Sequence, residues 1–139
     1  MNVDTTKIKS YIMEIKKNST ELRLLIQNHQ LIPDTVPMKA AKYMLIEIAE
    51  AISNILQHIL ARQKGIAVSG YVDTIIKAKE HCIISEKLFK QLKPFFDFRN
   101  SLIHRYWVID DSVLINNIIQ GIDDFDTFIR EIENYLNVI

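Results

Sequence analysis

The sequence predicts an all-α protein, an up-and-down bundle of four to five helices. Along most of the chain, apolar residues recur every three, four or seven positions, which is the period of an amphipathic helix. No segment alternates apolar and polar residues as a half-buried strand does. Glycine and proline number only three each, so they mark the breaks between helices. Long antiparallel helices joined by short links form a bundle.

An apolar stripe near the N-terminus predicts the first helix. Its members lie on one helical face: Ile8, Tyr11, Ile12, Ile15, Leu22, Leu25 and Ile26. Asp4 stands just before this stripe, and its carboxylate can accept an amide hydrogen bond at the start of the helix. Pro33 and Pro37 then bracket a break in the chain.

The second predicted helix runs from about Val36 to Lys64. The residues of one face are expected to point inward: Ala41, Leu45, Ile48, Ile52, Ile55 and Ile59. The residues of the opposite face are expected to meet water: Glu47, Glu50 and Asn54. Gly65 suits the left-handed conformation that closes a helix.

Two shorter helices are expected next. Ser69 can cap a third helix that ends at Lys79. The apolar residues of this helix are Val72, Ile75 and Ile76. Ser85 can cap a fourth helix that starts at Glu86. Pro94 lacks an amide hydrogen, so we expect it to kink this fourth helix or to restart it.

The last helix is predicted to open at Asp110 or Asp111. Its apolar stripe extends almost to the C-terminus: Ile115, Ile118, Ile122, Phe125, Ile129, Ile132 and Leu136. Gly121 lies within this helix and is expected to weaken it slightly.

Composition excludes several classes of protein. Of the 139 residues, 48% are apolar, which is too many for a disordered chain and enough for the core of one domain. The formal net charge is zero, with 17 basic and 17 acidic side chains. This balance argues against a protein that coats nucleic acid through bulk charge, but it is compatible with a local basic cluster.

Cys82 is the only cysteine, so the chain can form neither an intramolecular disulfide nor a paired-cysteine zinc site. We expect an inert, partly buried thiol. No apolar run approaches the roughly 20 residues needed to cross a bilayer, and the N-terminus lacks the apolar stretch of a signal peptide. We therefore expect a cytoplasmic protein without membrane contact.

Residues 95–107 are the segment that folding explains least. They hold the only tryptophan, three of the six phenylalanines and two arginines. Four residues at helical spacing are expected to face the core: Phe95, Phe98, Leu102 and Ile103. The remaining positions include six polar residues: Asp97, Arg99, Asn100, Ser101, His104 and Arg105.

Arg99 and His104 together suit the cleavage of RNA. Arginine holds a phosphate through two parallel hydrogen bonds and stays charged. Histidine, with an unperturbed pKa of about 6.5, can take a proton from the 2′-hydroxyl, whose oxygen then attacks the adjacent phosphorus. The guanidinium can offset the charge that develops on the phosphoryl oxygens, so this chemistry needs neither a metal nor another cofactor.

The geometry of this pair leaves alternatives open. On one ideal helix the two side chains lie about 140° apart. They converge if the helix ends or tightens near Leu102, or if two subunits contribute symmetry-related copies. A purely structural alternative has His104 cap a helix C-terminus and Arg99 form a surface ion pair. The possible acidic partners are Asp97, Asp110 and Asp111.

The same segment resembles a known family. Arg99 and His104 match the R-polar-x-x-x-H signature of HEPN domains, and Tyr106 extends it to the R-x4-H-x-Y pattern of HepT toxins. Further similar features are the downstream Ile109-Asp110, the helix with Glu47-x-x-Glu50, the short helix near Tyr71 and the turn Ile83-Ile84-Ser85. The resemblance covers nearly the whole chain and implies one HEPN-like helical domain, residues 1–139.

This resemblance implies a homodimer with two such motifs at a shared cleft. It also implies a metal-independent endoribonuclease toxin of a type VII (HEPN/MNT) toxin–antitoxin pair, which cleaves RNA such as tRNA or mRNA. Arg99 and His104 match the catalytic pair of the family, and Asn100 matches the polar position that supports it. The implied partner is an MntA-like minimal nucleotidyltransferase antitoxin. AMPylation of the tyrosine that matches Tyr106 would add bulk and negative charge beside the arginine and silence the toxin.

Two other functions remain open at this stage. Some related helical domains accompany nucleotidyltransferases as non-catalytic subunits that bind a nucleotide or substrate. A third alternative is a helical scaffold whose motif only builds the dimer. Lys90, Lys93 and Arg105 can extend a basic path for an RNA backbone, although a solvated face is an equal alternative for the two lysines.

Several other motifs favour ordinary structural roles. The Gly65–Gly70 segment copies the first half of a P-loop, but Tyr71 and Val72 replace the required Lys and Ser/Thr, so a loop between helices is expected. The remaining histidines, His29, His58 and His81, and the adjacent Cys82 are expected at the surface or its boundary. Trp107 is expected at the hydrophobic edge of the bundle and Tyr106 partly exposed.

Overall fold

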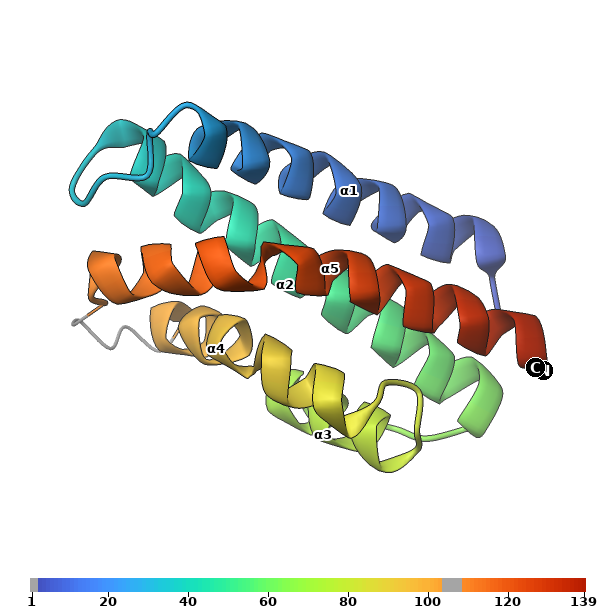
Figure 1. Ribbon diagram of the computed structural model, residues 1–139. Helices are drawn as coiled ribbons and strands as arrows, with labels where there is room; N and C mark the ends of the chain where they lie inside the picture. Colours follow the sequence, from blue (N-terminus) through green and yellow to red (C-terminus); the bar gives the residue numbers. More distant parts are fainter. Residues whose placement is uncertain (1–2, 104–108) are drawn as a thin grey trace.

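In the computed structural model of the protein, residues 3–103 and 109–139 are described, and they fold into helices joined by links without strands (Figure 1). The helices are α1 (Thr5–Gln27), α2 (Val36–Lys64), α3 (Tyr71–Glu80), α4 (Glu86–Ile103) and α5 (Asp111–Val138). The predicted all-α bundle is therefore confirmed. The bounds predicted for the second helix are also correct, and the third helix ends one residue later than expected.

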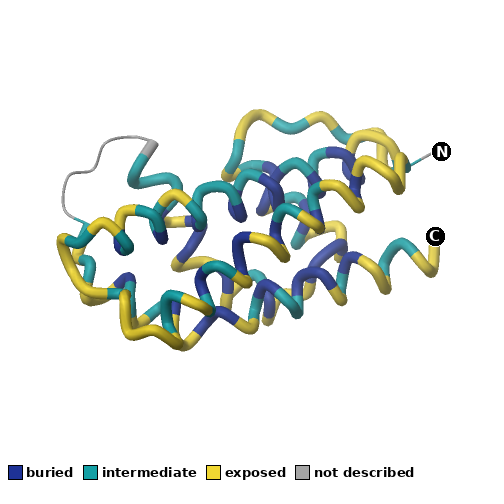
Figure 2. The backbone as a smooth tube through the Cα atoms, turned by 90° about the horizontal axis from the view of Figure 1, so that it is seen from above, coloured by how far each residue is buried: buried dark blue, intermediate teal, exposed yellow. Residues whose placement is uncertain are grey.

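Helix α2 is the centre of the bundle. It packs along the length of α1 and also contacts α3 and α4, while α5 lies against α1 and α4 (Figure 1). By length and composition alone α2 is apolar enough to cross a bilayer. However, 56% of its most apolar 18-residue window is buried inside the protein, which is the pattern of a core helix. Buried positions line the inner sides of the helices (Figure 2).

The helix ends follow local side-chain chemistry. Asp4 accepts a hydrogen bond from the Lys7 amide, and Ser85 accepts one from the Leu88 amide. Asp110 accepts hydrogen bonds from two amides in the first turn of α5. Gly65 adopts the left-handed conformation, with φ 65°, just after α2. These four predicted helix boundaries are confirmed.

The predicted start of α3 is wrong. Gly70, not Ser69, occupies the N-cap position, with φ 94° and no side-chain cap. The Ser69 amide instead donates to the Asp73 carboxylate at 2.9 Å. Of the three apolar residues of α3, Ile75 is buried, whereas Val72 and Ile76 are 50% and 38% exposed. The buried residues of α3 are Thr74, Ile75 and Ala78.

Helix α4 is continuous from Glu86 to Ile103 with Pro94 inside it, so the chain does not restart there. Phe95 and Phe98 are buried as expected and Leu102 is partly buried. Phe96, which was not expected in the core, is only 7% exposed.

The predicted exposure of His58 and that of Cys82 are both corrected. His58 was expected near the surface but is only 9% exposed, and its Nε2 accepts a hydrogen bond from the Asp4 amide at 2.8 Å. Cys82 was expected to be partly buried but is exposed, in the link after α3 with φ 57°.

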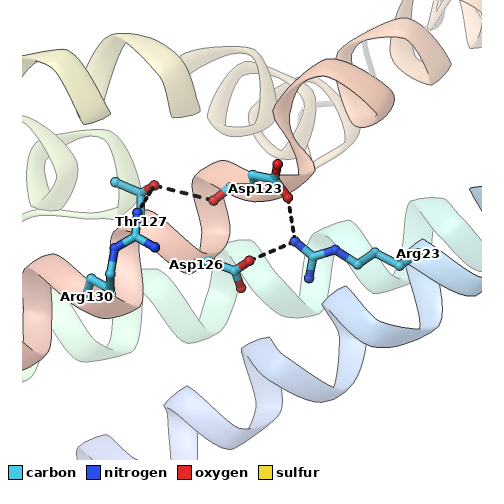
Figure 3. Close-up of polar contacts among 5 residues, drawn as sticks. All are labelled: Arg23, Asp123, Asp126, Thr127 and Arg130. Atoms are coloured by element: carbon cyan, nitrogen blue, oxygen red, sulfur yellow. Dashed lines mark hydrogen bonds and ion pairs between the residues drawn. The ribbon is translucent and has the colours of Figure 1, made fainter.

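An ion-pair network holds α1 against α5 (Figure 3). The Arg23 guanidinium lies 2.8 Å from Asp123 and 2.7 Å from Asp126. On α5 the neighbouring Arg130 donates to the Thr127 hydroxyl, and that hydroxyl donates to the Asp123 carbonyl. Because Asp123 is largely exposed, this network orients the helices more than it stabilises them.

Candidate functional site

Arg99 lies on the last turns of α4, and its guanidinium is anchored to α2. Its Nε and Nη2 atoms are each 2.8 Å from Oε1 of Glu50. The Arg99 side chain is 16% exposed and that of Glu50 is 43% exposed. Glu50 was expected to face water, and its side chain does so in part, but its pairing with Arg99 was not predicted. The guanidinium has five N–H donors, and this carboxylate uses only two of them.

Tyr71 provides a flat support beneath the same guanidinium. The Arg99 Cζ atom lies 4.1 Å from the centroid of the Tyr71 ring, within the range of a cation–π contact. Burial raises the pKa of the Tyr71 phenol well above its usual range, against the opposing effect of Arg99, so the phenol stays neutral. Its hydroxyl is buried and has no hydrogen-bond partner among the described residues.

Local structure explains why these groups meet. Glu50 lies midway along α2 and is partly exposed, and Tyr71 is the first residue of α3. Helix α4 packs against both of these helices, which brings Arg99 to residues 49 and 28 positions earlier in the chain. The site therefore depends on the packing of α2, α3 and α4.

The acidic partners considered for Arg99 are paired elsewhere. Asp97 lies 2.7 Å from Lys93, Asp111 lies 2.7 Å from Lys42, and Asp110 caps α5. The Lys42 ammonium holds the pKa of the Asp111 carboxyl below its usual range by donating a hydrogen bond. The surface ion pairs proposed for Arg99 as a structural alternative are therefore wrong, because its partner is Glu50.

Asn100 follows Arg99 and is half-buried on the wall of a cavity between α3 and α4. Of the two lysines considered for an RNA path, Lys90 lies 3.9 Å from Glu86 and Lys93 lies 2.7 Å from Asp97. Both lysines are exposed, but each has a carboxylate one helical turn away. This arrangement fits a solvated face as well as a basic path.

The other predicted site residues lie outside the described residues. They are His104, Arg105, Tyr106 and Trp107, and the side chain of Ile103 is likewise not described. The placement of His104 relative to Arg99 thus stays a prediction. Within residues 3–103 and 109–139, no group of three His, Cys, Asp or Glu side chains is placed to hold a metal ion.

Comparisons with solved structures identify the class of fold. The structure is similar to the tri-AMPylated HEPN toxin of Shewanella oneidensis, solved in complex with an MNT antitoxin, with a TM-score of 0.84 and 22% identity over 96% of this chain and 99% of that chain. It is also similar to YutE of Bacillus subtilis, a cytosolic protein of unknown function, with a TM-score of 0.81 and 18% identity over 98% of this chain and 92% of that chain. The fold is thus that of a HEPN toxin.

Sequence comparison identifies the family within this class. The profile of HepT-like ribonucleases matches residues 6–132, so the chain belongs to the HepT-like ribonuclease family. A curated relative, the tRNA nuclease HepT of Aphanizomenon flos-aquae strain 2012/KM1/D3, is 28% identical over 89 residues. This alignment covers 64% of the present chain and 60% of the relative, which is less than two thirds of the relative's length.

Proposed function

We propose that this protein is a metal-independent endoribonuclease toxin of a type VII toxin–antitoxin pair, active in the cytoplasm as a homodimer. The observation that carries the proposal is the held guanidinium of Arg99, which keeps three N–H donors beyond those used by Glu50 among the described residues. A phosphate at those donors would be bound through parallel hydrogen bonds. The family supports the same reaction class.

In the proposed reaction, His104 removes the proton of the 2′-hydroxyl. The resulting oxygen attacks the adjacent phosphorus, the bond from phosphorus to the 5′-oxygen breaks, and a proton is returned to that leaving oxygen. Arg99 stabilises the charge on the phosphoryl oxygens during this exchange. Glu50 and Tyr71 act as positioning residues, because both hold the guanidinium in place. Asn100 is assigned a positioning role beside this pair.

We further propose that the partner is an MntA-like minimal nucleotidyltransferase that silences the toxin by AMPylation of Tyr106. The structural neighbour from Shewanella oneidensis supports this assignment, since it is an AMPylated toxin bound to an MNT antitoxin. Tyr106 lies two residues after His104 in the sequence. A phosphate added to it would compete with RNA phosphate for the N–H donors of Arg99 that Glu50 does not use.

The test is RNA cleavage by the purified, unmodified protein in EDTA, with tRNA and total RNA as substrates. We expect the parent to cleave, and Arg99→Ala and His104→Ala each to lose at least about 100-fold in rate. Arg130→Ala, which removes an exposed arginine of α5, is the matched control and should cleave like the parent. All variants must first show the circular dichroism and oligomeric state of the parent.

Failure of the unmodified parent to cleave either RNA would overturn the nuclease assignment. The chain would then be better explained as a non-catalytic subunit that binds a nucleotide or substrate for a nucleotidyltransferase.

A further inference from the structure

A cavity of about 280 Å³ opens between α3 and α4 beside Arg99. Three aromatic rings contribute to its wall, those of Tyr71, Phe89 and Phe96, and Tyr71 meets Phe96 edge to face at 5.9 Å. The mouth is formed in part by Val72 and Ile76, which are 50% and 38% exposed. These two side chains lie one turn apart on α3, so they leave an apolar surface in water that the fold itself does not use.

The edge of the same cavity is polar on its α4 side. Asn100 offers an amide with both donors and an acceptor. Lys93 and Asp97 also line the cavity and pair with one another at 2.7 Å. A ligand that fits this wall needs a flat apolar face and an edge that forms hydrogen bonds.

The cavity shares one residue, Tyr71, with the proposed phosphate site. The centroid of the Tyr71 ring lies 4.1 Å from Cζ of Arg99, and the same ring lines the cavity. Asn100 follows Arg99 directly in the chain. The shared Tyr71 ring places the cavity next to the guanidinium, as one nucleotide requires if its phosphate contacts Arg99 and its base fills the cavity. The volume lies at the lower limit for ligand pockets and suits a single ring system rather than a folded chain.

We propose that this cavity is a base-binding subsite, which takes one unpaired nucleobase of the RNA whose phosphate contacts Arg99. The base would pack its faces against the aromatic and aliphatic wall and form hydrogen bonds through its edge with Asn100. This proposal rests on the proposed ribonuclease function and deepens it. It implies that single-stranded RNA, from which a base can turn outward, is the preferred substrate.

The test compares two uncleavable oligomers with equal phosphate charge. One is a 2′-O-methyl ribohexamer of mixed sequence and the other is its abasic counterpart. We expect the parent protein to bind the base-bearing hexamer at least about tenfold more tightly. Ile76→Glu places a charge in the cavity mouth. In this variant the affinity for the base-bearing hexamer should exceed that for the abasic hexamer by less than about threefold. Ile119→Glu adds the same charge at a 52% exposed position of α5 and should keep the parent's ratio.

Each outcome bears on a separate claim. Equal binding of the two hexamers by the parent, or an unchanged ratio in Ile76→Glu, would overturn the subsite. If the parent discriminates through Ile76 but cleaves no RNA, the subsite stands as a nucleotide site and the nuclease assignment fails. If it cleaves RNA without discrimination, the nuclease assignment stands alone.

Discussion

The contact between Arg99 and Glu50 places an anionic group directly behind a proposed anion-binding group. Because the Glu50 side chain is 43% exposed, solvent screens the pair and its contribution to folding stability is small. Its larger effect is to remove rotational freedom from a long side chain, which would otherwise be lost on binding a phosphate. The Tyr71 ring restricts the guanidinium plane in the same way.

Glu50→Gln is expected to reduce RNA cleavage about tenfold while the protein stays folded, since a neutral amide holds the guanidinium less firmly. The loss should appear mainly in kcat, because orientation in the transition state is what the carboxylate provides. Glu47→Gln, one turn earlier on α2, is the matched control, since Glu47 forms no ion pair within the described residues. Activity equal to the parent in Glu50→Gln would refute a positioning role.

His58 connects two helices through a single ring nitrogen. The Asp4 amide donates to its Nε2 at 2.8 Å, so the imidazole must be neutral at that atom. Burial lowers the pKa of His58 below its usual value, and the nearby charges of Arg62 and Lys7 lower it further, against the effect of Asp4. Protonation would remove the acceptor.

The pH dependence follows from this shift. Because the pKa of His58 is lower in the folded than in the unfolded chain, the unfolded chain takes up the proton first as pH falls. The contribution of His58 is complete above about pH 6.5 and declines below it. Urea unfolding should show that the free energy of unfolding falls less between pH 7.5 and pH 5.5 in His58→Gln than in the parent. His29→Asn, which changes an exposed histidine, should behave like the parent, and equal losses in all three would contradict the prediction.

Residue-level chemistry was partly predictable. The run of polar residues after Phe98 pointed to Arg99 and Asn100, because folding alone does not explain them. The partner of Arg99 was not predictable from local pattern, since Glu50 lies 49 residues away and only the packing of α2 on α4 joins them. The burial of His58 was missed for the same reason.

At the scale of the helices, their ends were the most predictable features. A cap such as Asp4 acts within three residues, so the local sequence contains both partners of the hydrogen bond. At α3 the prediction failed because Asp73, inside the helix, captures the Ser69 amide, and Gly70 takes the cap position. The cap of α4 also has a distant component, because Glu131 of α5 accepts hydrogen bonds from the Ser85 amide and hydroxyl at 2.7 Å.

Gly121 serves the contact between α4 and α5 rather than merely weakening α5. A Cβ at this position would lie 2.9 Å from Cε2 of Phe95. The Phe95 ring is 3% exposed and packs against Phe125 with 4.9 Å between centroids, so it has little room to move. The glycine lets the two helices approach closely.

Gly121→Ala is therefore expected to destabilise the fold by about 1 kcal/mol in urea unfolding. The overlap with Phe95 should outweigh the gain in helix propensity, which is also about 1 kcal/mol. Gln120→Ala, at an exposed neighbouring position, should change stability little. Combining Gly121→Ala with Phe95→Leu should cost less than the sum of the two single changes, whereas strict additivity would exclude the overlap.

At the scale of the whole molecule, the bundle was predictable but its exposed faces were not. The helical period shows that α3 is amphipathic, yet a ten-residue helix with apolar residues on two sides does not reveal which side packs. Of the three apolar residues named for this helix, Ile75 is buried, whereas Val72 and Ile76 are exposed. The spacing of apolar residues along one chain likewise does not reveal the oligomeric state.

We expect the protein to be a homodimer in solution, because the proposed chemistry brings two copies of the Arg99 motif together. Light scattering at micromolar concentration should give a mass about twice the 16.2 kDa of one chain. A monomer mass across that concentration range would be incompatible with a shared cleft.

The elements that carry Glu50, Tyr71 and Arg99 are consecutive in the chain, namely α2, α3 and α4. Helices α1 and α5 flank them in the sequence, and the start of α1 and the end of α5 lie at the same end of the bundle (Figures 1 and 2). A circular permutant can therefore join the two termini by a short linker and begin in the exposed link at residues 28–35. In such a chain α1 would be the final helix, and α2, α3 and α4 would remain consecutive. The place of α1 in the chain order can therefore change without dividing the site.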